Sequence, residues 1–95
     1  MRLSVDEMKL VTEINKIFCY DTPEKDMLEY ILINIKIQGS GYLIDIMNIS
    51  SLGIPIFAIL ASSRKQSLAE FVNHLKSGSV NFYDCKDVLV RFLIA

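Results

Sequence analysis

The sequence predicts a small α/β domain with its elements in the order helix, helix, strand, strand, helix, helix. Three observations lead to this prediction. Apolar residues recur at helical spacing near both ends of the chain, they alternate along 42–47, and they form an unbroken run over 56–60. Ninety-five residues are enough for one domain, so residues 1–95 are taken as a single unit. No internal repeat is evident.

The N-terminal region predicts a helix over 5–18. Ser4 and Glu7 have the spacing of a capping box, in which each side chain bonds the backbone N–H of the other residue. The apolar residues that follow recur at helical spacing, as on one face of a helix. They are Val5, Met8, Val11, Ile14 and Phe18.

A second helix is predicted over 22–38. Thr22 can cap it, and Pro23 suits the first helical position because its missing N–H would have no partner there. Gly39 ends it. The segment 31–37 is so rich in isoleucine that a strand there is also possible, and both interpretations are kept.

Two strands are predicted in the middle of the chain. Residues 39–41, Gly-Ser-Gly, indicate a turn, and the alternation over 42–47 then indicates a strand. The second strand, 54–60, is apolar on both faces and so suits a central position in a sheet. Gly53 permits a sharp turn of the backbone before this strand, and Pro55 is tolerated near the start of a strand.

Two strands alone make a marginal sheet, so we expect a partner, a second copy or the 31–37 segment to complete it. Two capping patterns can open the helix that follows, Ser63 with Gln66 or Ser67 with Glu70. This helix carries one apolar stripe, formed by Leu68, Phe71, Val72 and Leu75, and it ends at Gly78.

The composition argues for a protein that binds other proteins. Hydrophobic residues make up 52% of the chain and the mean hydropathy is +0.35, which is more apolar surface than a soluble monomer of this size hides with ease. The net charge is −1 with the charges interspersed, which argues against a nucleic-acid partner. Two cysteines and the lack of a signal-like N-terminus fit a reduced, cytoplasmic location. The apolar run around 46–63 is too interrupted for a membrane span.

The C-terminal helix, from about residue 84 to the end, suggests where such an interface lies. Its last residues, "VLVRFLIA", contain a single charge, on Arg91. Val88, Leu89, Phe92 and Leu93 can face the core, but Val90 and Ile94 then fall elsewhere on the helix. We therefore predict that Val90 and Ile94 belong to an interface with a partner or a second copy.

No complete catalytic or metal-binding motif is present. His74 is the only histidine, and it lies at the edge of the apolar stripe. Cys19 and Cys85 are far apart in the sequence, whereas zinc ligands normally come in pairs two to four residues apart. We interpret them as two buried structural thiols and expect no catalytic residue, metal or cofactor.

Two groups remain as candidates for binding a small ligand. Asp45 lies in an otherwise apolar predicted strand, where a carboxylate is costly unless it is paired or functional. Ser62, Ser63, Arg64 and Lys65 follow the second predicted strand and could bind an anion at the start of the next helix. The alternative is that Asp45 faces solvent and that the second group is a solvated cap.

The stretch "YLIDIMNISSLGIPIFAIL" resembles a segment of the YcaO-domain proteins, and the resemblance covers residues 24–61. The family pattern is a strand ending near an Asp, a short polar loop, then Gly-Ile-Pro and an apolar strand. The matching segments are Ile44-Asp45, Asn48 to Leu52, Gly53-Ile54-Pro55 and Ile56 to Leu60. The resemblance implies a fragment or degenerate relative of an ATP-dependent enzyme that modifies peptide backbones. The family's ATP- and magnesium-binding motifs are not found, so no catalytic residue is carried over.

Two functions thus follow from the sequence. The first is a small intracellular binding protein of the immunity-protein or antitoxin kind, which acts through an apolar interface with a protein partner or with itself. The alternative is the YcaO-type fragment.

Overall fold

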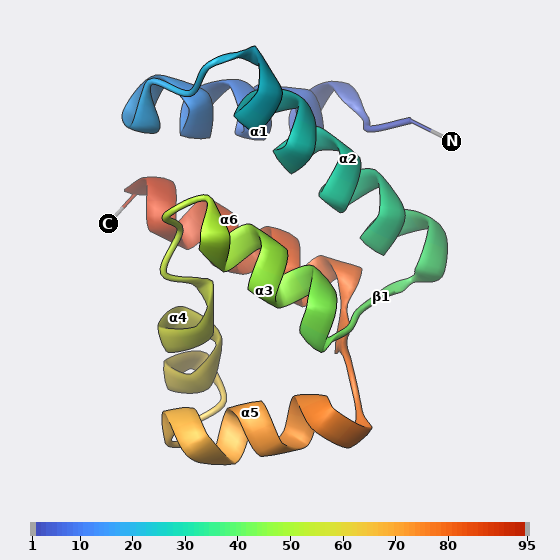
Figure 1. The fold of residues 1–95 in the computed structure, drawn as a ribbon, viewed down its shortest axis with the longest axis vertical. Coiled ribbons are helices and arrows are strands. Elements are labelled where there is room, and N and C mark those ends of the chain that lie inside the picture. Colours follow the sequence, from blue (N-terminus) through green and yellow to red (C-terminus); the bar gives the residue numbers. More distant parts are fainter. Residues whose placement is uncertain (1, 95) are drawn as a thin grey trace.

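The computed structural model describes residues 2–94 and is mostly helical (Figure 1). Its elements are α1 (Val5–Phe18), α2 (Thr22–Gln38), β1 (Ser40–Gly41), α3 (Leu43–Ser51), α4 (Ile56–Ser63), α5 (Leu68–Ser77), β2 (Val80–Asn81) and α6 (Phe82–Ile94). The predicted α/β class therefore holds only loosely, because the sheet consists of two strands of two residues each.

Both predicted strands are wrong. Residues 42–47 fall mostly in α3, where Asp45 lies in the first turn and accepts a hydrogen bond from the backbone N–H of Tyr42 at 2.9 Å. The alternating apolar residues that predicted a strand thus lie at the start of a helix. Residues 54–60 fall mostly in α4, which begins directly after Pro55. A short apolar run has the same appearance in a buried strand and a buried helix, and here the helix is the outcome.

The other helices are confirmed. α1 spans the predicted 5–18 and starts with the expected capping box. α2 spans 22–38 with no strand over 31–37, but its N-cap is Asp21 and the predicted cap, Thr22, is the first helical residue. Of the two capping patterns, Ser67 with Glu70 opens α5. α6 begins two residues earlier than expected, because Asn81 accepts a hydrogen bond from the backbone N–H of Asp84 at 2.8 Å and caps the helix.

The structure exposes a short internal repeat. Residues 39–45, Gly-Ser-Gly-Tyr-Leu-Ile-Asp, correspond to 78–84, Gly-Ser-Val-Asn-Phe-Tyr-Asp. Each copy leaves a helix, forms one strand and enters the next helix, so α2-β1-α3 and α5-β2-α6 are two equivalent units. The strands pair antiparallel with Gly41 opposite Val80, which are the equivalent positions of the repeat. The pairing is therefore centred on a local two-fold axis between the two units.

Little space is left beside Gly41 at this junction. A Cβ atom on Gly41 would lie 3.2 Å from the Cys85 sulfur and 3.4 Å from the Ile46 side chain. Ile46 and Cys85 are themselves equivalent positions of the repeat, and both are fully buried. The two units thus meet at a point where the backbone of one packs directly on side chains.

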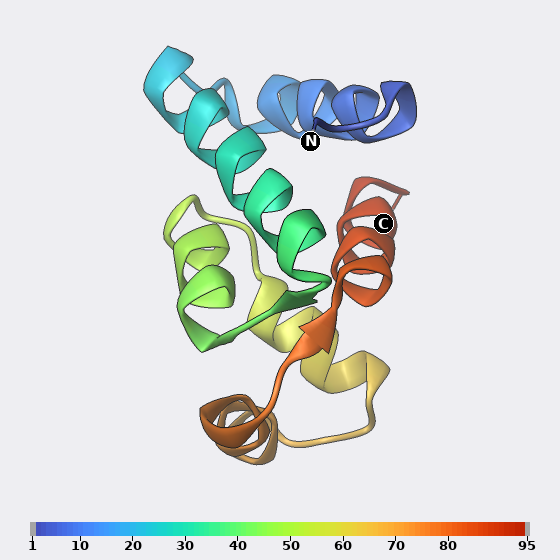
Figure 2. The same ribbon diagram turned by 90° about the vertical axis from the view of Figure 1, so that its right-hand side faces the viewer.

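The helices are arranged in layers around one core. α1 and α2 form one end of the molecule, α3 and α6 lie beneath them, and α4 leads to α5 at the opposite end (Figures 1 and 2). All six helices contribute buried apolar residues. The radius of gyration is 12.6 Å, close to the value of about 12 Å for a single compact domain of this length.

An aromatic cluster fastens the end of α1 to the rest of the fold. The Phe18 ring stacks on Tyr20 at 5.1 Å and on Phe92 of α6 at 5.7 Å. The Tyr20 hydroxyl donates a hydrogen bond to the carbonyl of Leu52, at the end of α3. Gly53 follows with a φ of +91°, a conformation that favours glycine, and the Phe18 ring leaves little room for a Cβ there. The glycine before Pro55 thus serves a tight turn between helices.

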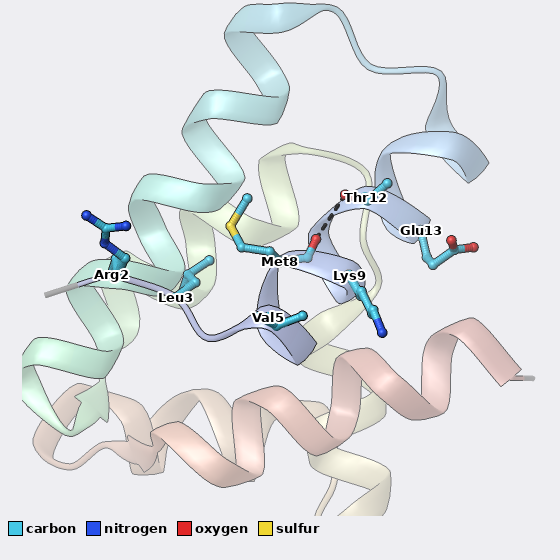
Figure 3. Close-up of a pocket in the computed structure, with 7 residues that line it drawn as sticks. All are labelled: Arg2, Leu3, Val5, Met8, Lys9, Thr12 and Glu13. Carbon is cyan, nitrogen blue, oxygen red and sulfur yellow. Dashed lines mark hydrogen bonds between the residues drawn. The ribbon is translucent and has the colours of Figure 1, made fainter.

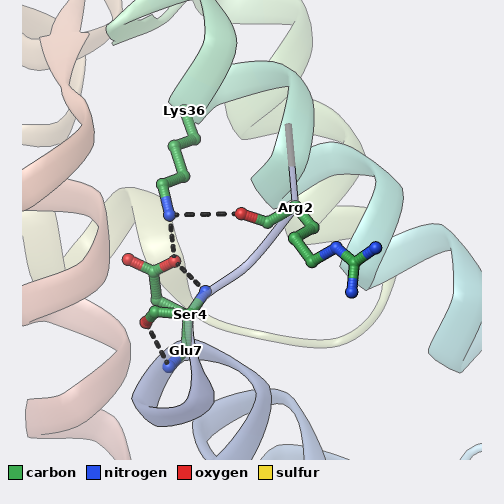
Figure 4. A network of polar contacts seen from close by, with 4 residues as sticks. All are labelled: Arg2, Ser4, Glu7 and Lys36. Atoms are coloured by element: carbon green, nitrogen blue, oxygen red, sulfur yellow. Dashed lines mark hydrogen bonds and ion pairs between the residues drawn. The ribbon is translucent and has the colours of Figure 1, made fainter.

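A partly buried ion pair joins α1 to α2 (Figure 4). Glu7 is only 6% exposed, and the Lys36 ammonium donates to its carboxylate at 2.6 Å. Lys36 also donates to the Arg2 carbonyl at 3.3 Å, so it anchors the N-terminal segment as well. Burial alone would raise the pKa of Glu7, but the hydrogen bonds from Lys36 and from the Ser4 backbone outweigh it and lower that pKa below its usual value.

We expect the substitution Glu7→Gln to remove a pH-dependent part of the stability. Glutamine can keep the cap with Ser4 but loses the charge, which should cost about 1–2 kcal/mol near neutral pH. Because folding lowers the pKa of Glu7, its stabilisation is fully present above the ordinary carboxyl value of 4.5 and is lost as the pH falls through the folded value. Urea unfolding of both proteins across this range measures the difference.

Glu13→Gln is the matched control, since Glu13 pairs with Lys16 at 3.1 Å on the exposed face of the same helix. Its effect should be within about 0.5 kcal/mol. A Glu7→Gln deficit that stays constant with pH, or one no larger than that of the control, would contradict the role assigned to this pair.

Candidate functional site

Asp45, the first predicted ligand-binding residue, caps a helix in the structure. Its carboxylate accepts hydrogen bonds from the Tyr42 backbone at 2.9 Å and from the Gln38 amide at 3.4 Å. The predicted strand is absent, and a carboxylate in the first turn of a helix is common without a ligand. The position of Asp45 is therefore explained by helix capping alone. A ligand-binding role for Asp45 stays a prediction from the sequence.

Ser62, Ser63, Arg64 and Lys65 were expected at a helix N-terminus, and this placement is wrong. They lie at the C-terminal end of α4, where carbonyl groups carry partial negative charge and favour cations over anions. The nearest helix N-terminus, that of α5, is already capped by Ser67 and Glu70. The Arg64 guanidinium lies 5.9 Å from the centre of the Phe71 ring, consistent with a cation at a helix end.

His74 lies on α5 and is half-buried. Its Nε2 atom is 3.5 Å from the Arg64 guanidinium and 3.4 Å from the Ser79 carbonyl. In the part of the chain that the structure describes, no three His, Cys, Asp or Glu side chains are grouped to hold a metal ion. Nor is any helix there long and apolar enough to cross a membrane.

The two cysteines differ, which corrects the expectation that both are buried. Cys85 is fully buried beside Gly41, whereas Cys19 is exposed and ends α1 in a left-handed conformation. Burial first, and then the nearby carboxylates of Asp84 and Asp45, raise the pKa of the Cys85 thiol to about 12. Cys85 is therefore held in its unreactive thiol form.

Val90 and Ile94 are exposed by 40% and 79%, as their predicted interface role requires. They extend a stripe along α6 that begins at Tyr83, which is 72% exposed. The structure contains no second chain, so the interface itself stays a prediction.

A larger apolar surface lies along α5. One hollow, of about 620 Å³, lies between the start of α3 and the end of α5, and its lining includes Leu43, Ile44 and Leu75. A second, of about 660 Å³, follows the outer side of α5 past Leu68 and Val72. Lys76 lines both. We call this surface the α5 groove and define it by its two hollows: Tyr42, Leu43, Ile44, Leu68, Ala69, Val72, Asn73 and Leu75–Ser79.

The α5 groove combines exposed apolar side chains with a single charge. Ile44 is 61% exposed, Leu68 54% and Tyr42 47%. Of the residues that line it, only Lys76 carries a formal charge, and within residues 2–94 its ammonium has no ion-pair partner. Such a surface suits an apolar segment that brings one carboxylate.

Sequence reasoning missed this groove for two reasons. Ile44 was assigned to a strand, and Leu68 and Val72 were assigned to the core stripe of α5. The buried residues of α5 are only Phe71 and Leu75. The apolar stripe thus contains more residues than the helix buries in the core. These additional apolar residues were the signal for the groove that the sequence offered.

Comparisons with known proteins identify no relative. No family model matches the chain, and neither the curated proteins nor the solved structures give a significant match. The resemblance to YcaO-domain proteins stays a prediction, and the two strands that it implies in this segment are the helices α3 and α4.

We expect a thiol-specific disulfide reagent to modify one cysteine in the folded protein. Cys19 should react quickly because it is exposed, while at pH 8 a thiol of pKa about 12 is ionised in roughly one molecule in ten thousand. Reaction of Cys85 should require unfolding by urea. Cys19→Ser should remove the fast phase. A native Cys85 that reacts at the rate of Cys19 would contradict the burial described above.

Proposed function

We propose that this chain is a protein-binding module and that the α5 groove receives an apolar segment of a partner protein. The observation that carries the proposal is the groove itself, with apolar side chains from α3 and α5 on either side of the Lys76 ammonium. The expected partner segment carries apolar side chains flanking an Asp or Glu, because a carboxylate over Lys76 supplies the missing charge. An immunity-protein or antitoxin role is one setting for such binding.

The exposure of these side chains supports the proposal. A contiguous apolar patch on a small protein exposes surface that water solvates poorly, so covering it is favourable. Burying a side chain such as Ile44 or Leu68 contributes about 1.5–3 kcal/mol. Several such anchors are needed to outweigh the cost of association, and the two hollows of the groove offer them along α5.

A displayed library of random peptides, selected on the immobilised protein, tests this function even though the partner protein is unidentified. We expect the enriched peptides to share apolar residues around an Asp or Glu. Their dissociation constants, measured by titration calorimetry, should rise at least about tenfold for Ile44→Lys, in line with a loss of about 1.4 kcal/mol or more. Lys76→Glu should weaken the acidic peptides most.

Tyr83→Lys is the matched control, because Tyr83 holds the position in the second repeat that Ile44 holds in the first and is likewise exposed. It lies outside the groove and should leave peptide binding unchanged. Selection that yields no peptides, or peptides that bind the Ile44→Lys variant as tightly as the original protein, would refute the proposed function.

A further inference from the structure

A second apolar surface is carried by α1 and α2, which lie at the opposite end of the molecule from α5 (Figures 1 and 2). Val5 is 73% exposed, Tyr30 65% and Ile37 57%. Met8 and Ile33 are half-buried against the core. We call this surface the α1–α2 face.

One end of the α1–α2 face is positively charged. The N-terminal segment and α1 line an open hollow of about 470 Å³, where Val5 and Met8 lie between Arg2 and Lys9 (Figure 3). Its one acidic residue, Glu13, is already paired with Lys16. Arg2 and Lys9 therefore set the sign of the charge at this end.

The other end is negatively charged. A hollow of about 220 Å³ on α2 is lined by Asp26, Glu29, Tyr30 and Ile33, with no cation among them. This hollow lies on α2, which packs against α1 and is tied to the N-terminal segment by the hydrogen bond from Lys36 to the Arg2 carbonyl. The two hollows thus lie on neighbouring helices.

The two charged ends are well separated along this surface. The views in Figures 1 and 2 agree that α1 and α2 run in roughly opposite directions. The Arg2 carbonyl lies beside Lys36 near the end of α2, whereas Asp26 is ten residues earlier in α2, a distance of roughly 15 Å at 1.5 Å per residue. Charges so far apart on a surface are largely screened from one another by salt, so each end remains available to an outside charge.

From this arrangement we infer that the α1–α2 face is a docking surface for a second copy of the same chain. In a symmetric dimer the same patch meets itself, so it must carry both halves of every complementary contact. A two-fold axis lying in the interface between the two hollows places Arg2 and Lys9 of each copy over Asp26 and Glu29 of the other. The apolar side chains between them meet at the centre.

The charges favour this occupant over a membrane surface. An anionic bilayer attracts Arg2 and Lys9 but repels Asp26 and Glu29 on the same face, whereas a second copy satisfies both groups. The interface is separate from the α5 groove, so the dimer does not depend on the proposed function, and failure of either one leaves the other standing.

A charge-swap experiment tests the dimer. Sedimentation equilibrium of the full chain should show a monomer–dimer equilibrium that weakens as salt is added. Arg2→Glu with Lys9→Glu makes both ends negative, and Asp26→Lys with Glu29→Lys makes both ends positive, so each double variant should self-associate at least about tenfold more weakly. An equimolar mixture of the two should form a heterodimer, because both sets of contacts are then restored with reversed roles.

Two controls make the result decisive. Val90→Lys with Ile94→Lys alters the separate apolar stripe of α6, whose predicted interface is then with a different partner and not with a second copy, so these changes should leave the dimer intact. Circular dichroism confirms that each variant folds, and the single substitutions Lys9→Glu and Asp26→Lys replace any double variant that does not. The inference is overturned by a wild-type chain that stays monomeric at about 1 mM, by a mixture that does not associate, by dissociation on changing Val90 and Ile94, or by binding to anionic vesicles in place of self-association.

Discussion

The close packing at Gly41 is the constraint on which the arrangement of the helices depends. Gly41 and Val80 are paired across two very short strands, and the Cys85 sulfur and the Ile46 side chain fill the space where a side chain at 41 would lie. Two residues per strand cannot make a stable sheet alone. The pair instead fixes the point at which the α2-β1-α3 and α5-β2-α6 units meet, and the buried side chains around it supply the stability.

The positions of the two apolar surfaces follow from this junction. The local two-fold pairing directs α3 and α5 away from the same point, so the start of one and the end of the other border the α5 groove. On the other side, α2 leaves the junction toward α1 and is fastened to it by the Glu7–Lys36 pair, which forms the α1–α2 face. One contact point thus explains why apolar surface is left exposed at opposite ends of a small protein.

The sequence predicted the elements whose signals are local and failed where the outcome depends on packing. Capping patterns at Ser4 and Ser67 and the stop at Gly39 located three helices correctly, because a cap acts within one helical turn. The apolar run after Pro55 carried no such signal, and only its burial among the other helices determined that it is helical. The repeat has just three identical residues in seven, so it was recognised only when the structure showed Gly41 paired with Val80. The α5 groove was beyond prediction for the same reason, since it unites residues from α3 and α5, which are not neighbours in the sequence.

A double-mutant cycle between Gly41 and Cys85 tests the central constraint most directly. Gly41→Ala adds a methyl group 3.2 Å from the Cys85 sulfur, and the overpacking should lower the free energy of unfolding by about 1–3 kcal/mol. In a Cys85→Ala background the sulfur is gone, so the same substitution should cost clearly less, with a coupling energy of about 0.5 kcal/mol or more. An equal cost of Gly41→Ala in both backgrounds would show that the junction is not tightly packed and would contradict this account.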